Sequence, residues 1–69
     1  MKIEYDREVD ALYIRLQEKM VARTTELEDG IYIDLDENGK LIGLEILDAT
    51  QRYPKADIFN LTTENLVVE

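Results

Sequence analysis

Residues 34 to 45 read DLDENGKLIGLE, which matches the EF-hand calcium-loop pattern D-x-[DN]-x-[DN]-G-x5-E. The side chains of Asp34, Asp36, Asn38 and Glu45 supply the oxygen atoms that Ca²⁺ prefers. An EF-hand loop joins two helices, however, whereas both flanks of this stretch alternate between apolar and polar residues, as strands do. The pattern therefore favours a β-hairpin, in which these groups would not surround one ion.

A second group of carboxylates, Asp6, Glu8 and Asp10, lies close together in a predicted turn. In a metal-assisted enzyme these residues could be ligands of Mg²⁺. Aspartates in turns also bond nearby backbone N–H groups, and Arg7 is the only basic residue within this turn. The sequence favours turn chemistry, and the metal-assisted enzyme stays as the alternative.

Most catalytic constellations cannot be assembled from this chain. It contains no serine, cysteine or histidine, which excludes the usual nucleophile–base pairs, thiolate sites and imidazole sites. The three glycines, at positions 30, 39 and 43, are too scattered to form a phosphate-binding loop. We therefore predict a non-catalytic protein with no cofactor and no metal.

Length and charge narrow the class of protein further. The 69 residues predict one small domain, residues 1–69. The net charge of −8 disfavours nucleic-acid binding. Residues 26 to 39 contain six carboxylates and no Lys or Arg, which indicates either a solvated surface or a docking surface for a basic protein partner. No apolar run is long enough for a membrane span or a signal peptide, so we expect a cytoplasmic protein without membrane contact.

Residues 1–16 alternate as two strands of an antiparallel hairpin. A four-residue loop, Arg7 to Asp10, places apolar residues opposite one another on one face and leaves the other face polar. The pairs expected on this basis are Asp6 with Ala11, Tyr5 with Leu12, Ile3 with Ile14, Met1 with Leu16, Glu4 with Tyr13, and Lys2 with Arg15.

Residues 31–47 predict a second hairpin, in which Asn38 and Gly39 form a two-residue type I′ turn. This register puts six aliphatic residues on one face, as the pairs Leu35–Ile42, Ile33–Leu44 and Ile31–Ile46. The opposite face is acidic and aromatic, and we predict that it binds a partner. The residues of this predicted binding face are Tyr32, Asp34, Asp36 and Glu45.

The remaining segments complete a predicted α+β fold that is mainly β. Residues 21–27 are β-branched and alternating, so the region 1–47 is expected to form an antiparallel five-strand meander. Pro54 could begin a short C-terminal helix over residues 54–61, covering the apolar face of the sheet. The first and fifth strands would then be open edges, and with so small a core we expect a homodimer.

Two stretches carry a resemblance to a known family. YDREVDALYIRL at residues 5–16 and DGIYIDLDENGKLIGLEILDAT at residues 29–50 resemble the small prokaryotic domain of unknown function family 2283. Thr50 stands where that family often has serine, and the tail after Tyr53 matches nothing. The resemblance implies a β-rich domain without an established activity or assigned catalytic residues.

Members of that family are sometimes encoded next to small toxin-like proteins, which implies an antitoxin-like role. Our first hypothesis is therefore a non-catalytic protein-interaction module. The second is the metal-assisted enzyme that uses Asp6, Glu8 and Asp10. The third is a structural domain that only assembles with itself.

Overall fold

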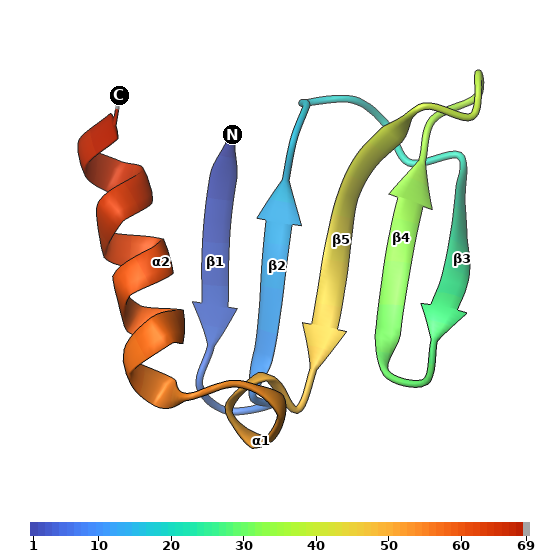
Figure 1. Cartoon of the computed structure of the whole chain (residues 1–69). Helices are drawn as coiled ribbons and strands as arrows, with labels where there is room; N and C mark the ends of the chain where they lie inside the picture. Colours follow the sequence, from blue (N-terminus) through green and yellow to red (C-terminus); the bar gives the residue numbers. More distant parts are fainter. Residues whose placement is uncertain (69) are drawn as a thin grey trace.

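The computed structural model describes the backbone of residues 1–68 and the side chains of residues 1–61. Five strands precede two helices along the chain (Figure 1). The elements are β1 (Lys2–Asp6), β2 (Ala11–Arg15), β3 (Arg23–Glu28), β4 (Ile31–Leu35), β5 (Leu41–Leu47), α1 (Ala49–Arg52) and α2 (Lys55–Val68).

The predicted fold class is confirmed, because the chain forms a five-strand antiparallel sheet followed by a C-terminal helix. The predicted order of a simple meander is wrong. The strands lie in the order β1-β2-β5-β4-β3, so that β2 to β5 form a Greek key (Figure 1). The edges of the sheet are therefore β1 and β3, and the fifth strand is central.

Strand composition accounts for this order. The apolar sequence LIGLEIL of β5 has partners on both sides, and three of its seven residues are buried. All six residues of β3, RTTELE, are exposed, as suits a polar and charged strand at an edge. The short connection from β2 to β3 suggested neighbouring strands, but residues 16–22 instead carry the chain across to the far edge (Figure 1).

The β1–β2 hairpin has the predicted register, with Tyr5 opposite Leu12 and Ile3 opposite Ile14. In the second hairpin, Ile31 pairs with Ile46 and Ile33 pairs with Leu44, also as predicted. Alternation alone specified these registers because a shift of one residue would turn the apolar side chains to the polar face.

The turn of the second hairpin differs from the prediction. The register shifts after Asp34, so that Leu35 pairs with Leu41 and not with Ile42. The N–H of Gly39 donates to the carbonyl of Asp36 (2.9 Å), and Gly39 alone in this turn has a positive φ, 82°. This is a longer loop that ends in a left-handed glycine, whereas a type I′ turn would also need a positive φ at Asn38.

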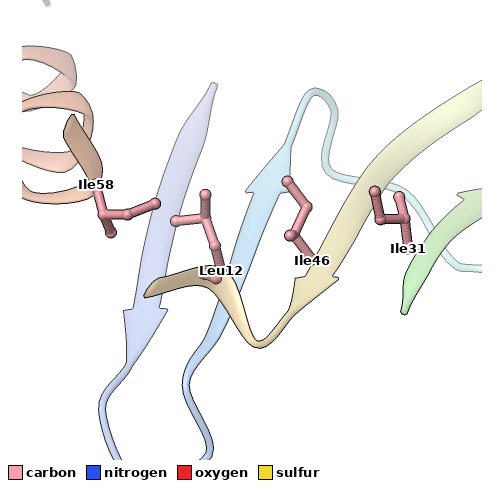
Figure 2. Close-up of a cluster of buried hydrophobic side chains, with 5 residues drawn as sticks. Leu12, Ile31, Ile46 and Ile58 are labelled. Carbon is pink, nitrogen blue, oxygen red and sulfur yellow. The ribbon is translucent and has the colours of Figure 1, made fainter. Parts of the chain in front are cut away.

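One face of the sheet, which we call the apolar face, carries the core. Its buried cluster consists of Leu12, Ile31, Ile46, Ala49 and Ile58. Figure 2 shows Ile58 of α2 pointing toward Leu12, with Ile46 and Ile31 following along the same face. The opposite face, which we call the outer face, carries the polar residues of the alternating strands.

The C-terminal helix begins one residue after Pro54 and runs to Val68, beyond the predicted end at residue 61. No glycine or proline follows Pro54 to end it, and the helix continues through residues 66–68. The helical turn α1 was not predicted. It places Ala49 in the core, fully buried.

Replacing Leu12 by alanine tests the position of the core. Leu12 is only 2% exposed, so Leu12→Ala should lower the free energy of unfolding by about 2–5 kcal/mol. The matched control is Leu27→Ala, at a side chain that is 63% exposed, where we expect a change within about 0.5 kcal/mol. Urea denaturation measures both. Equal losses in the two variants would contradict the assigned core.

Candidate functional site

A row of alternating carboxylates and phenols crosses the outer face from one edge of the sheet to the other. It contains one residue from each strand, because the registers of the four strand pairs place these residues side by side. We call it the carboxylate–tyrosine row. In spatial order it consists of Glu4, Tyr13, Glu45, Tyr32 and Glu26.

The phenol of Tyr13 reaches across β5 to the next row of the outer face. Its O–H donates a 2.6 Å hydrogen bond to Oδ2 of Asp34, which lies opposite Gly43. A Cβ at Gly43 would lie 2.7 Å from this phenol oxygen and 2.5 Å from the carbonyl oxygen of Ile14. The missing side chain of Gly43 therefore makes room for the phenol.

Asp34 is held from two sides. Its Oδ1 accepts a 2.6 Å hydrogen bond from the hydroxyl of Thr24, while Oδ2 accepts the phenol of Tyr13. The guanidinium of Arg15 lies 5.2 Å from the centre of the Tyr13 ring, within the range of a cation–π contact. Asp34 thus joins β2, β3 and β4 across the central strand, and both of its oxygens already have partners.

The environment of Tyr13 keeps its phenol protonated. Burial, the hydrogen bond to Asp34 and the negative charge of that carboxylate together raise the pKa of Tyr13 to about 12, and burial is the largest cause. At neutral pH this phenol is a hydrogen-bond donor and not a nucleophile or a base.

Three members of the row have no such partners. In the part of the chain whose side chains are described, Tyr32, Glu45 and Glu26 make no side-chain hydrogen bond and no ion pair. Tyr32 and Glu45 are half-buried and lie directly opposite each other on β4 and β5. These groups present an acidic and aromatic surface to solvent.

Asp36 does not lie on this surface, which corrects its predicted place on the binding face. The carboxylate is buried, and its Oδ1 accepts the backbone N–H groups of Asn38 and Lys40, both at 2.9 Å. Its Oδ2 lies 3.6 Å from the ammonium of Lys19. The register shift turns Asp36 into the loop, where it satisfies the backbone of the turn.

The residues that match the calcium-loop pattern thus lie at separate places in the hairpin and do not surround one point. Asp34 is bonded to Tyr13 and Thr24, Asp36 is inside the turn, and Glu45 lies in the carboxylate–tyrosine row. Among the described residues, no group of three Asp or Glu side chains could hold a metal ion.

The acidic turn is held by its own hydrogen bonds. Oδ1 of Asp6 accepts the N–H of Glu8 at 2.9 Å, which is ordinary turn chemistry. Asp10 adopts a left-handed backbone (φ 54°), and its carboxylate accepts the hydroxyls of Tyr5 (2.6 Å) and Thr50 (2.9 Å). The carboxylates of Asp6 and Asp10 therefore bond to the protein itself.

Asp10 connects the two stretches of sequence that carried the family resemblance. The N–H of Thr50 donates to its carboxylate at 3.1 Å, and the N–H of Ala49 donates to its carbonyl at 2.9 Å. The hydrogen bond from Tyr5 is the main cause that lowers the pKa of Asp10, and the same bond raises the pKa of Tyr5. The carboxylate thus stays charged while it fixes α1 to the β1–β2 turn.

Sequence reasoning found Tyr32, Asp34 and Glu45 but missed how Tyr13, Thr24 and Gly43 support them. Tyr13 and Tyr32 each fall on the outer face of their own hairpin by alternation. Their common row depends on β2 lying beside β5, which no local pattern indicates. The available signal was a glycine at position 43, inside an otherwise regular strand.

Replacing Asp34 by asparagine tests the Tyr13 network. We expect the pKa of Tyr13 to fall from about 12 toward the ordinary 10.0, because the charged acceptor is lost. Titration of the phenolate absorbance measures this, and Tyr13→Phe identifies the step that belongs to Tyr13. Since folding raises this pKa, the stabilisation is complete below pH 10.0 and is lost as the pH rises toward 12. An unchanged titration in Asp34→Asn would contradict the network.

Replacing Asp36 by asparagine tests the buried carboxylate of the turn. The N–H of Lys40 is the main cause that holds the pKa of Asp36 below its ordinary 3.8. The charged form therefore stabilises the fold above pH 3.8, and this stabilisation is lost as the pH falls through the lowered pKa. At neutral pH Asp36→Asn should melt several degrees lower, and the difference should shrink in acid. Glu37→Gln, at the exposed neighbour, should melt like the unmodified chain at every pH.

Comparison with known proteins finds the following relatives. A protein of Methanocaldococcus jannaschii named as uncharacterised is 42% identical over 53 residues, which cover 77% of this chain and 45% of that protein. A Methanosarcina mazei protein named "Putative hypoxanthine phosphoribosyltransferase" is 35% identical over 65 residues, 94% of this chain and 47% of that protein. The chain thus spans about half the length of the curated relatives it matches. No solved structure matches it.

A family model matches most of the chain, over residues 2–49. The matched region contains the whole sheet and ends at Ala49, within the contact between α1 and Asp10. The model's description is protein of unknown function (DUF2283). The chain therefore belongs to the family of proteins of unknown function DUF2283.

Proposed function

We propose that this chain is a non-catalytic protein-interaction module whose outer face binds a basic segment of a partner protein. The observation that carries the proposal is the carboxylate–tyrosine row, in which Glu4, Glu45 and Glu26 alternate with two phenol rings across all five strands. The row lies on the sheet face opposite to α2, so the described part of the chain leaves it open to a partner.

The chemistry of the row suits Lys and Arg side chains. A cation placed at Tyr32 would have a phenol ring beneath it and a carboxylate on either side, from Glu45 and Glu26. Arg15 already occupies the equivalent position over Tyr13. The chain's own contact is therefore an example of the contact that we propose for the partner.

A shallow hollow of about 580 Å³ extends the row near the β1–β2 turn. Four acidic residues and one basic residue, Arg7, line it beside Tyr13; the acidic residues are Glu4, Asp6, Glu8 and Glu45. With a net charge of −8, the chain would attract a basic partner over distance and orient it before contact. These features support an extended basic segment more than a small ligand.

An antitoxin-like role is the specific form of this proposal. Toxins that act on RNA need basic surfaces to bind phosphates, and an acidic sheet face could cover such a surface. The interaction would take place in the cytoplasm, where the sequence predicts this protein to be. In the described part of the chain, no helix is long and apolar enough to cross a membrane.

Two enzyme functions have less support. The metal-assisted enzyme would need Asp6, Glu8 and Asp10 around one ion, whereas Asp6 and Asp10 bond to the turn and to α1. Transferase chemistry, which the name of the Methanosarcina mazei relative suggests for that protein, would need a phosphate-binding loop. Here Gly30 and Gly39 serve turns, and Gly43 lies under Tyr13.

A capture experiment with matched variants tests the proposed face. The test partner is the product of the neighbouring gene, and on the antitoxin-like proposal it is a basic protein that the tagged chain captures at low salt and releases at high salt. Tyr32→Ala and Glu45→Gln should each weaken binding by roughly tenfold or more, an effect of about 1.4 kcal/mol or more. Glu37→Gln, which removes the same charge from the exposed hairpin loop, should change affinity less than about twofold.

The control separates a docked face from attraction by net charge alone. Equal weakening by Glu45→Gln and Glu37→Gln would mean that only the total charge matters, which contradicts a specific face. Failure to capture the neighbouring product at low salt would contradict the antitoxin-like role.

A further inference from the structure

The apolar face of the sheet is wider than the helix that covers it. Five strands at about 4.8 Å spacing span roughly 24 Å, whereas one helix with its side chains is about 10 Å across. In this chain α2 lies along the β1 side of the sheet (Figure 1), and its strand contacts are mainly with β1. The described residues contain no second long helix for the side formed by β5, β4 and β3.

The part of this face away from α2 contains the buried Ile31, Ile42 and Ile46, and beside them apolar residues that are only half-buried. Ile14, Leu44 and Ile33 follow one another across β2, β5 and β4, and each keeps part of its surface exposed. A mainly apolar groove of about 340 Å³ runs between α2 and the strands β2 and β5, where Leu12, Ile14 and Ile46 line it, and Asp57 of α2 is its one charged residue. Leu61 and Tyr53, at its rim, are 39% and 47% exposed.

The charges of the sheet are arranged to favour contact between two apolar faces. The inward-facing positions of β1, β2, β4 and β5 carry no carboxylate, and Glu28, opposite Ile31, lies at the edge of the sheet on β3. The outer face carries the carboxylate–tyrosine row. If two copies packed through their apolar faces, two sheet layers would separate their acidic rows. That distance exceeds the screening length of about 8 Å at physiological salt. The net charge of −8 on each copy would therefore repel the second copy less in this contact than in a contact through the acidic outer faces.

The size of the face also suits a stable dimer. The chain is a slab of 35 × 31 × 17 Å. Its broad side, with α2 included, has a planar area of roughly 1,000 Å², which leaves room for a contact of up to the 800 Å² or so that each partner buries in a standard protein interface.

We propose that a second copy of this chain covers the apolar face, with the α2 of each copy lying over β5 and β4 of the other. Such a contact is two-fold symmetric, because each copy offers the same helix and the same uncovered strands. It differs from pairing through open strand edges, and it leaves both outer faces pointing to solvent. The inference does not depend on the proposed function of the outer face.

Sedimentation equilibrium at micromolar concentration tests the dimer directly. We expect twice the 8.0 kDa mass of one chain, and a melting temperature that rises with protein concentration, because association stabilises the folded state. A mass of 8.0 kDa together with a concentration-independent melting temperature would overturn the proposal.

Substitutions at two adjacent residues then show which face of the sheet forms the dimer contact. Leu44→Gln, on the apolar face, should raise the dimer dissociation constant by roughly tenfold or more. Glu45→Gln, the next residue on the outer face, should leave it unchanged. Circular dichroism of the Leu44→Gln variant shows whether it stays folded. If the variant unfolds, the mass of the unmodified chain and the concentration dependence of its melting temperature decide whether the dimer forms.

The dissociation constants of the Leu44→Gln and Glu45→Gln variants also distinguish the alternative dimer contacts. An unchanged dissociation constant in a folded Leu44→Gln variant would overturn the proposal in favour of the β1 or β3 edge. A dimer weakened by Glu45→Gln would overturn it in favour of the outer face.

Discussion

The pairing of β5 with both β2 and β4 is the constraint on which the rest of this structure depends. It places Ile46 in the core between Leu12 and Ile31. It also completes the carboxylate–tyrosine row, which would otherwise be two separate pieces on two hairpins. Because β5 ends beside the β1–β2 turn, the chain that follows it can reach Asp10 and fix α1 there. The pairing of β5 with β2 and β4 thus determines the core, the carboxylate–tyrosine row and the position of α1.

The two faces of the sheet have separate chemistry, and alternation along the strands produces that separation. Apolar side chains gather on the face that α2 partly covers, while carboxylates and phenols gather on the other. A small sheet with one helix leaves both faces partly open. The outer face suits a basic partner and the apolar face suits a second copy, so the two proposed contacts do not compete for the same surface.

Local polar groups account for where sequence reasoning failed within the second hairpin. Asn38-Gly39 is a strong signal for a tight turn, and it led to a register in which Asp36 stayed on the outer face. The carboxylate of Asp36 instead accepts two backbone N–H groups, and this favours a longer loop with only Gly39 in the left-handed region. A turn that binds its own aspartate can thus prevail over the shorter loop, because the buried carboxylate of Asp36 needs hydrogen-bond donors.

The sequence by itself determined the strands, the registers of both hairpins near their cores, and the exclusion of serine, cysteine and histidine chemistry. These follow from residue type and from alternation with period 2, which are local properties. Only the tertiary structure decided that β5 lies between β2 and β4, that Gly43 makes room for Tyr13, and that Asp10 meets Thr50. These contacts join residues that are far apart along the chain, and their free energy depends on the packing of the whole sheet.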